Sequence, residues 1–128
     1  MKIKILLFII YLILFSFNSI AQNSERKFKI HTLAFYNLEN LFDTINDVNK
    51  NDEASPIMEI KFNRSGIYKQ KIANMAKVIS EIGYDVTNRP PTIVGICEVE
   101  NRKVVEDLIS DEKLKNYNYG IVHYESPD

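Results

Sequence analysis

The chain has 128 residues, of which 45% are hydrophobic and 26% are charged, and its formal net charge is −1. This length and balance fit one small globular domain and exclude a disordered, collagen-like or disulfide-rich chain. The only cysteine, Cys97, excludes an internal disulfide and a finger-type zinc site, and the charge argues against a protein that coats nucleic acid.

Residues 1–21 are predicted to be a secretory signal peptide. Lys2 and Lys4 precede a stretch from 5 to 17 that is apolar apart from one serine, and small residues follow where signal peptidase requires them. The stretch is shorter than the roughly 20 residues of a membrane span, so we expect no stable membrane anchor. We expect an exported protein, periplasmic or extracellular, whose mature part is residues 22–128 with a net charge of −3, since two lysines and no acid are lost.

The mature part begins with a predicted strand from Phe28 to Tyr36, amphipathic at first and more apolar towards its end. Polar residues interrupt the apolar run at Asn37, Glu39 and Asn40, where the strand is expected to end. Residues 43–60 are mostly polar and are expected to form a loop.

A helix is predicted from Ser65 to Ile82, because apolar side chains recur there at intervals of three and four residues. Asn63 or Ser65 can cap its start, and Gly83 can take the left-handed conformation that ends it. Four basic side chains are expected on the solvated flank of this helix: Lys61, Arg64, Lys69 and Lys71.

The second half of the chain repeats the alternation of strand and helix. Residues 92–97 form an apolar, β-branched run typical of a strand buried on both faces, so Cys97 is also expected to be buried. A helix over 102–114 follows, with Asn101 as its N-cap, and residues 119–124 are predicted to form a third strand. The order strand, helix, strand, helix, strand predicts an α/β fold.

Polar residues follow both predicted inner strands: Asn37 and Glu39 the first, Glu98 and Glu100 the second. In α/β folds functional groups collect beyond the carboxyl ends of strands, and a carboxylate there is costly unless it is paired or holds a cation. Such an oxygen-rich site suits magnesium. For Glu100 and Asn101 we favour an ordinary helix start. Composition alone leaves Glu98 balanced between a solvated turn and a ligand.

Two segments together resemble the endonuclease/exonuclease/phosphatase family, which includes deoxyribonuclease I, the abasic-site endonucleases and the sphingomyelinases. They are residues 35–43, Phe-Tyr-Asn-Leu-Glu-Asn-Leu-Phe-Asp, and residues 93–101, Ile-Val-Gly-Ile-Cys-Glu-Val-Glu-Asn. The resemblance includes the helix between them and the last residues, 119–128, and so covers nearly all of the mature part.

The resemblance implies a role for each matching residue. Asn37 would orient the phosphate and the metal site, and Glu98 would bind the catalytic cation, Mg²⁺ or alternatively Mn²⁺ or Ca²⁺. Glu39 is a weaker candidate for a position near the metal. Cys97 departs from the glutamine of many family members, but that glutamine is not a metal ligand.

The family fold is a four-layer α/β sandwich, and residues 22–128 would be its first half, β-α-β-α-β, incomplete at the C-terminus. The histidine and aspartates that activate water in the family would lie in the second half. We therefore expect a truncated phosphoester hydrolase that is inactive alone and marginally stable, and a monomer at full length. Its substrate, nucleic acid or a small phosphodiester, stays undecided.

Two alternatives stay open. One is a non-catalytic binding module or pseudoenzyme on the same fold. The other is a self-contained small α/β domain that binds a partner through its open sheet face.

Overall fold

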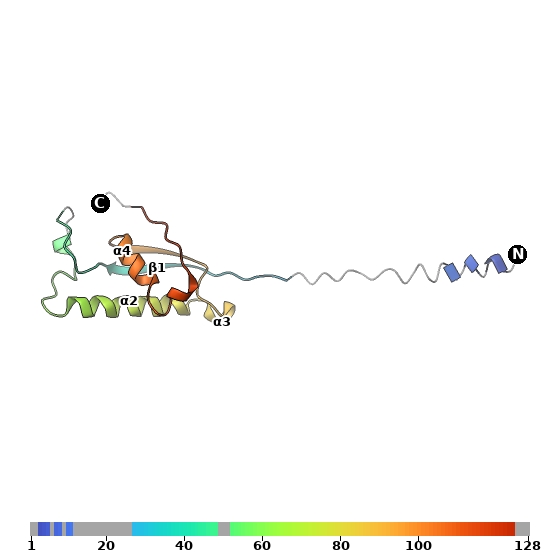
Figure 1. Ribbon diagram of the computed structural model, residues 1–128, viewed down its shortest axis with the longest axis horizontal. Coiled ribbons are helices and arrows are strands. Elements are labelled where there is room, and N and C mark those ends of the chain that lie inside the picture. The colour runs from blue at the N-terminus through green and yellow to red at the C-terminus, as the bar shows by residue number, and fades with distance from the viewer. Residues whose placement is uncertain (1–2, 6, 9, 12–26, 49–51, 125–128) are drawn as a thin grey trace.

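A computed structural model describes residues 3–5, 7–8, 10–11, 27–48 and 52–124 (Figure 1). The described residues among the first eleven are helical, and the rest of the predicted signal peptide lies outside the described residues. Within the described part of the chain, no helix has the length and apolar character needed to cross a membrane.

The folded part is a two-stranded parallel sheet with helices packed against it, which confirms the α/β class (Figure 1). Strand β1 (Leu33–Leu41) pairs with β2 (Ile93–Val99). Helix α2 (Arg64–Glu81) lies between them in the chain, and α4 (Arg102–Ile109) follows β2. The short elements are η1 (Asp52–Ala54), α3 (Tyr84–Thr87) and η2 (Lys115–Tyr117).

The hydrophobic core lies between one face of the sheet and the helices α2 and α4. Side chains alternate along a strand, so Ala34 and Leu38 of β1 are buried while Leu33 and Phe35 are exposed. The predicted stripe of α2 supplies the opposing surface. The buried cluster contains Leu38, Leu41, Ile72, Ala76, Ile79, Val104, Leu108 and Leu114.

The other face of the sheet is open and apolar among the described residues. Phe35 is 88% exposed and Ile93 59%, and Cys97 is also exposed. A Cβ at Gly95 would lie 2.6 Å from the Phe35 ring, so this glycine lets the ring lie across β2. The prediction that 92–97 is buried on both faces was wrong, as was the burial of Cys97, because the described helices cover only one face.

The boundaries of two elements, the first strand and the last helix, differ clearly from the sequence prediction. The first strand begins at Leu33 and runs on to Leu41, so the polar residues after Tyr36 lie inside it. Helix α4 ends at Ile109 rather than at residue 114. After Ile109 the chain leaves the helix. The Asp111 carboxylate accepts a hydrogen bond from the Lys113 amide, a local turn that competes with continuation of the helix.

Residues 119–124, predicted to be a third strand, form no strand. Val122 and Tyr124 are each 86% exposed. The segment is attached at its start, where the Tyr119 hydroxyl donates a hydrogen bond to the carbonyl of Pro91. Apolar alternation therefore occurs here without the backbone pairing that defines a strand.

The caps of the helices follow the prediction in two of three places. Asn101 caps α4, since its Oδ1 accepts a hydrogen bond from the Val104 amide at 3.0 Å. Gly83 follows α2 at φ 67°. Asn63 precedes α2 but its side chain makes no capping hydrogen bond, because its backbone is left-handed.

Candidate functional site

The two residues expected to form the site lie in contact at the carboxyl ends of the strands. Asn37 Nδ2 donates a hydrogen bond to Glu98 Oε1 at 2.7 Å. Asn37 Oδ1 accepts a second one from the Glu39 amide at 2.6 Å, which fixes the orientation of the Asn37 amide. Both side chains are exposed, so a ligand can reach them.

An irregular stretch of backbone produces this contact. Asn37 is in register with Cys97 and Leu41 with Val99, so four residue steps on β1 lie opposite two on β2. β1 therefore bulges between Asn37 and Leu41. Bulges of this kind re-aim side chains and are common beside active sites.

The dihedral angles single out the same place. Six described non-glycine residues have positive φ, and four of them are asparagines, which tolerate the left-handed region well. The other two are Glu39 (φ 52°) and Glu98 (φ 57°), both at the bulge. Strained backbone of this kind clusters at functional sites, so the two glutamates mark this place as the candidate site.

Lys71 of α2 also contacts the bulge, which the sequence analysis did not predict. Its Nζ donates hydrogen bonds to the carbonyl oxygens of Glu39 (2.5 Å) and Asn40 (3.0 Å). Partial burial lowers the pKa of Lys71, while the carboxylates of Glu39 and Glu98 act in the opposite direction. The assignment of Lys71 to a solvated flank was wrong. The only advance sign was its place next to Ile72 in the buried stripe.

Arg64 is a second exception to the solvated flank. Its guanidinium donates to the carbonyl oxygens of Ile60 and Met58, at 2.5 and 2.6 Å. Arg64 therefore holds the end of the 43–60 loop against the start of α2. Lys61 and Lys69 are exposed, as predicted.

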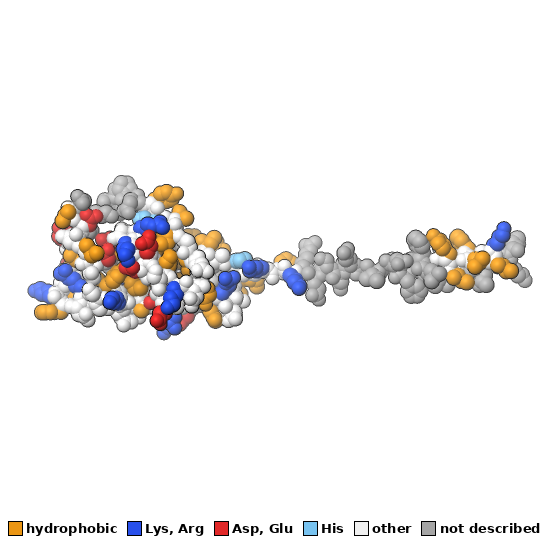
Figure 2. Space-filling model, in the orientation of Figure 1, with side chains coloured by type: hydrophobic (Ala, Val, Ile, Leu, Met, Phe, Trp, Pro, Cys, Tyr) orange, Lys and Arg blue, Asp and Glu red, His pale blue; other side chains and the backbone are white. Residues whose placement is uncertain are grey.

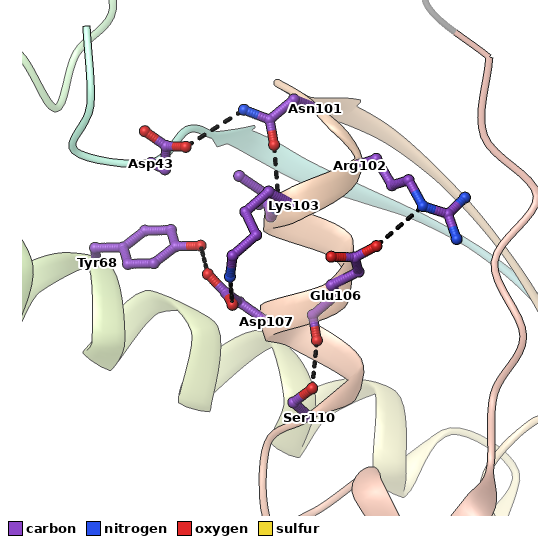
Figure 3. A network of polar contacts seen from close by, with 9 residues as sticks. Asp43, Tyr68, Asn101, Arg102, Lys103, Glu106, Asp107 and Ser110 are labelled. Atoms are coloured by element: carbon purple, nitrogen blue, oxygen red, sulfur yellow. Dashed lines mark hydrogen bonds and ion pairs between the residues drawn. The ribbon is translucent and has the colours of Figure 1, made fainter.

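A second set of polar contacts joins the segments that follow the two strands, and Figure 3 shows the contact between Asp43 and Asn101. The Asp43 amide donates to Glu100 Oε2 at 2.6 Å, and Asn101 Nδ2 donates to Asp43 Oδ2 at 3.3 Å. Glu100 and Asn101 thus act at the start of α4, as the sequence analysis favoured, and hold the loop after β1 beside it.

The same network links α2 to α4. The Tyr68 hydroxyl donates to Asp107 Oδ2 at 2.9 Å, and Lys103 forms an ion pair with Asp107 (Figure 3). Burial, followed by the hydrogen bond to Asp107, raises the pKa of Tyr68 well above its usual value.

Stability is therefore expected to depend on Tyr68 at alkaline pH. When folding raises the pKa of a tyrosine, the protonated tyrosine stabilises the folded state. This contribution to the free energy of unfolding is complete below about pH 10, the pKa of a tyrosine in the unfolded chain. This contribution is lost as the pH rises further, because the unfolded chain then ionises more readily. We expect Tyr68→Phe to lower the urea midpoint at pH 8 and to flatten its decline between pH 10 and 11. An unchanged decline would show that another group causes it.

The donor set fits a magnesium-type ion. Glu98 uses one carboxylate oxygen for Asn37 and has a second, and its exposure leaves room for the water ligands that Mg²⁺ retains. Nowhere in the described residues do three His, Cys, Asp or Glu side chains gather as a closed metal cage. The arrangement therefore suits an open site with one or two carboxylates. Glu39 reaches Asn37 through its backbone amide, not its carboxylate.

His31 takes no part in this site. His31 Nδ1 lies 2.8 Å from Thr92 Oγ1, beside the opposite ends of the strands. This placement agrees with a structural role.

The fold is a parallel α/β arrangement with an amide and a carboxylate at neighbouring strand ends. This is the type of site in an α/β protein that binds a cation through oxygen ligands. The model of the endonuclease/exonuclease/phosphatase family matches residues 32–128, more than half of the chain. The chain belongs to this family, and membership indicates a phosphoester hydrolase. No curated protein and no solved structure matches the chain.

Proposed function

We propose that the chain belongs to an exported, divalent-metal-dependent phosphoester hydrolase, in which Glu98 binds the metal and Asn37 orients the phosphate. The observation that carries the proposal is the 2.7 Å hydrogen bond between Asn37 and Glu98 at the ends of two parallel strands. Export rests on the signal-peptide pattern of residues 1–21. Glu39 is the weaker candidate for a second carboxylate at the metal.

When bound, Mg²⁺ (or Mn²⁺ or Ca²⁺) would polarise a phosphoryl oxygen and stabilise charge on the leaving oxygen. Glu98 supplies the carboxylate oxygen that holds the ion beside β2. The Asn37 amide is fixed by the Glu39 amide, so its nitrogen faces Glu98. An amide nitrogen has two donor hydrogens, and the second is available to orient a phosphate oxygen.

We also propose that residues 22–128 do not suffice for hydrolysis. The open sheet face, with Phe35 and Ile93 exposed, calls for a further layer of structure to bury it. His31 precedes Asn37 by six residues and contacts Thr92 beside the opposite ends of the strands, so it is no candidate for activating water at Asn37. The formal net charge of −1 does not favour one substrate, and basic and acidic side chains are interspersed on the face drawn in Figure 2.

The test compares the protein expressed from its complete coding region with residues 1–128 alone. With Mg²⁺ and bis(p-nitrophenyl) phosphate, we expect the former to release nitrophenol, and EDTA or Glu98→Ala to abolish release. We expect residues 1–128 alone to stay at the buffer rate. Glu98-dependent hydrolysis by residues 1–128 would refute the insufficiency. No hydrolysis by either protein would refute the enzyme and favour a binding module.

A further inference from the structure

The bulge that places Asn37 against Glu98 is held by hydrogen bonds to its carbonyl groups, one of them from the Phe42 amide to the Asn40 carbonyl at 3.1 Å. Glu39 and Asn40 are consecutive residues in the left-handed region, at φ 52° and 57°, within a strand. Left-handed backbone is costly at a glutamate and better tolerated by asparagine, and the strained conformation persists only where surrounding groups hold it. The described contacts show one side chain that reaches both carbonyls.

That side chain is Lys71. Its ammonium group donates to the carbonyl oxygens of Glu39 and Asn40 and so bridges the two left-handed residues. An ammonium has three donors and can serve two acceptors at once. Lys71 is half-buried, whereas Lys69 and Lys77 on the same helix are exposed.

Helix α2 is fixed on both sides of Lys71. Ile72, the next residue, is buried in the core at 7% exposure, and the hydroxyl of Tyr68, one turn earlier, donates a hydrogen bond to Asp107 of α4. The ammonium is also within electrostatic reach of the Glu39 and Glu98 carboxylates. Lys71 thus connects the hydrophobic core to the backbone of the site.

We propose that Lys71 is a positioning residue of the site, which holds the left-handed bulge at Glu39 and Asn40 in the form that sets Asn37 against Glu98. This inference rests on the proposed metal-binding function of Glu98. Groups that hydrogen-bond directly to a metal ligand typically change metal affinity 10- to 100-fold when removed, and Lys71 acts one step further out, through the bulge and Asn37.

Two measurements test it on the full chain. The first is NMR of the unmodified chain, in which we expect scalar couplings across the hydrogen bonds from Lys71 Nζ to the carbonyl carbons of Glu39 and Asn40. The second is Mn²⁺ affinity, from the signal of free Mn²⁺ in electron paramagnetic resonance. We expect Lys71→Met to weaken it by about tenfold, although the loss of a positive charge near Glu39 and Glu98 would by itself strengthen it. We expect Lys71→Arg to retain most of the affinity and the exposed control Lys69→Met to leave it unchanged.

Full Mn²⁺ affinity in Lys71→Met would overturn the proposal, as would absent couplings in the unmodified chain. If Lys71→Met does not fold, the Mn²⁺ affinity of Lys71→Arg and the couplings in the unmodified chain still test the proposal. Failure of the unmodified chain to bind Mn²⁺ would instead overturn the proposed function, and the couplings would then report on the bulge separately.

Discussion

Glu98→Gln is expected to weaken Mn²⁺ binding to the chain by about tenfold or more, while the fold is retained. The substitution keeps the size of the side chain and one oxygen. That oxygen can accept the hydrogen bond that Asn37 Nδ2 donates to Glu98 Oε1 at 2.7 Å in the unmodified chain. It removes the negative charge, and carboxylates are the protein ligands that Mg²⁺-type ions use. Even groups outside the ligand shell change affinity 10- to 100-fold, so the loss of a ligand charge should be at least as large.

Glu100→Gln is the matched control for this prediction. Glu100 lies two residues further along the chain, and its carboxylate accepts a hydrogen bond from the Asp43 amide, which glutamine can replace. We expect nearly unchanged affinity in Glu100→Gln and an intermediate loss in Glu39→Gln. Equal losses in all three variants would indicate diffuse electrostatic attraction in place of a defined site.

Leu38→Ala is expected to lower the free energy of unfolding by about 2–5 kcal/mol, because it removes a fully buried side chain and leaves a cavity. Leu38 is 0% exposed and belongs to the core cluster, although its neighbours Asn37 and Glu39 are exposed. The same residue therefore fixes the strand at the point where the site begins. Urea denaturation followed by circular dichroism measures the change.

Leu33→Ala is the control on the same strand, since Leu33 is 63% exposed on the open face. Surface substitutions usually change stability by less than about 0.5 kcal/mol. A loss as large as that of Leu38→Ala would mean that the open face is covered in solution.

Local periodicity predicted the helices well. The spacing of Ile72, Ala76 and Ile79 is a property of the chain itself, and these residues form the buried face of α2. The capping residue Asn101 was predictable for the same reason, because a cap needs only the next few backbone amides.

Features that depend on pairing between distant segments were predicted poorly. Polar residues after Tyr36 implied the end of a strand, but β1 continues to Leu41 because its bulge is set by its register with β2. Residues 119–124 have strand-like composition, yet whether such a segment pairs depends on an edge elsewhere in the fold. The apolar run of β2 could not show that the described helices cover one face only.

The candidate site divides along the same line. The sequence motifs identified Asn37 and Glu98, and the structure places them in contact. The part played by Lys71 could not be predicted, because it follows from where α2 packs and from which carbonyls the bulge turns towards it. The weaker candidate, Glu39, contributes its backbone to these contacts.

The most direct test of the Asn37–Glu98 site is the position of bound Mn²⁺ in the unmodified chain. Trace Mn²⁺ broadens the NMR signals of nearby amides in a ¹⁵N-labelled protein. We predict that broadening is strongest at Asn37, Glu39 and Glu98. Broadening centred on the acidic loop at Asp47, Asp52 and Glu53, with the signals of Asn37 and Glu98 unaffected, would contradict the proposed metal site.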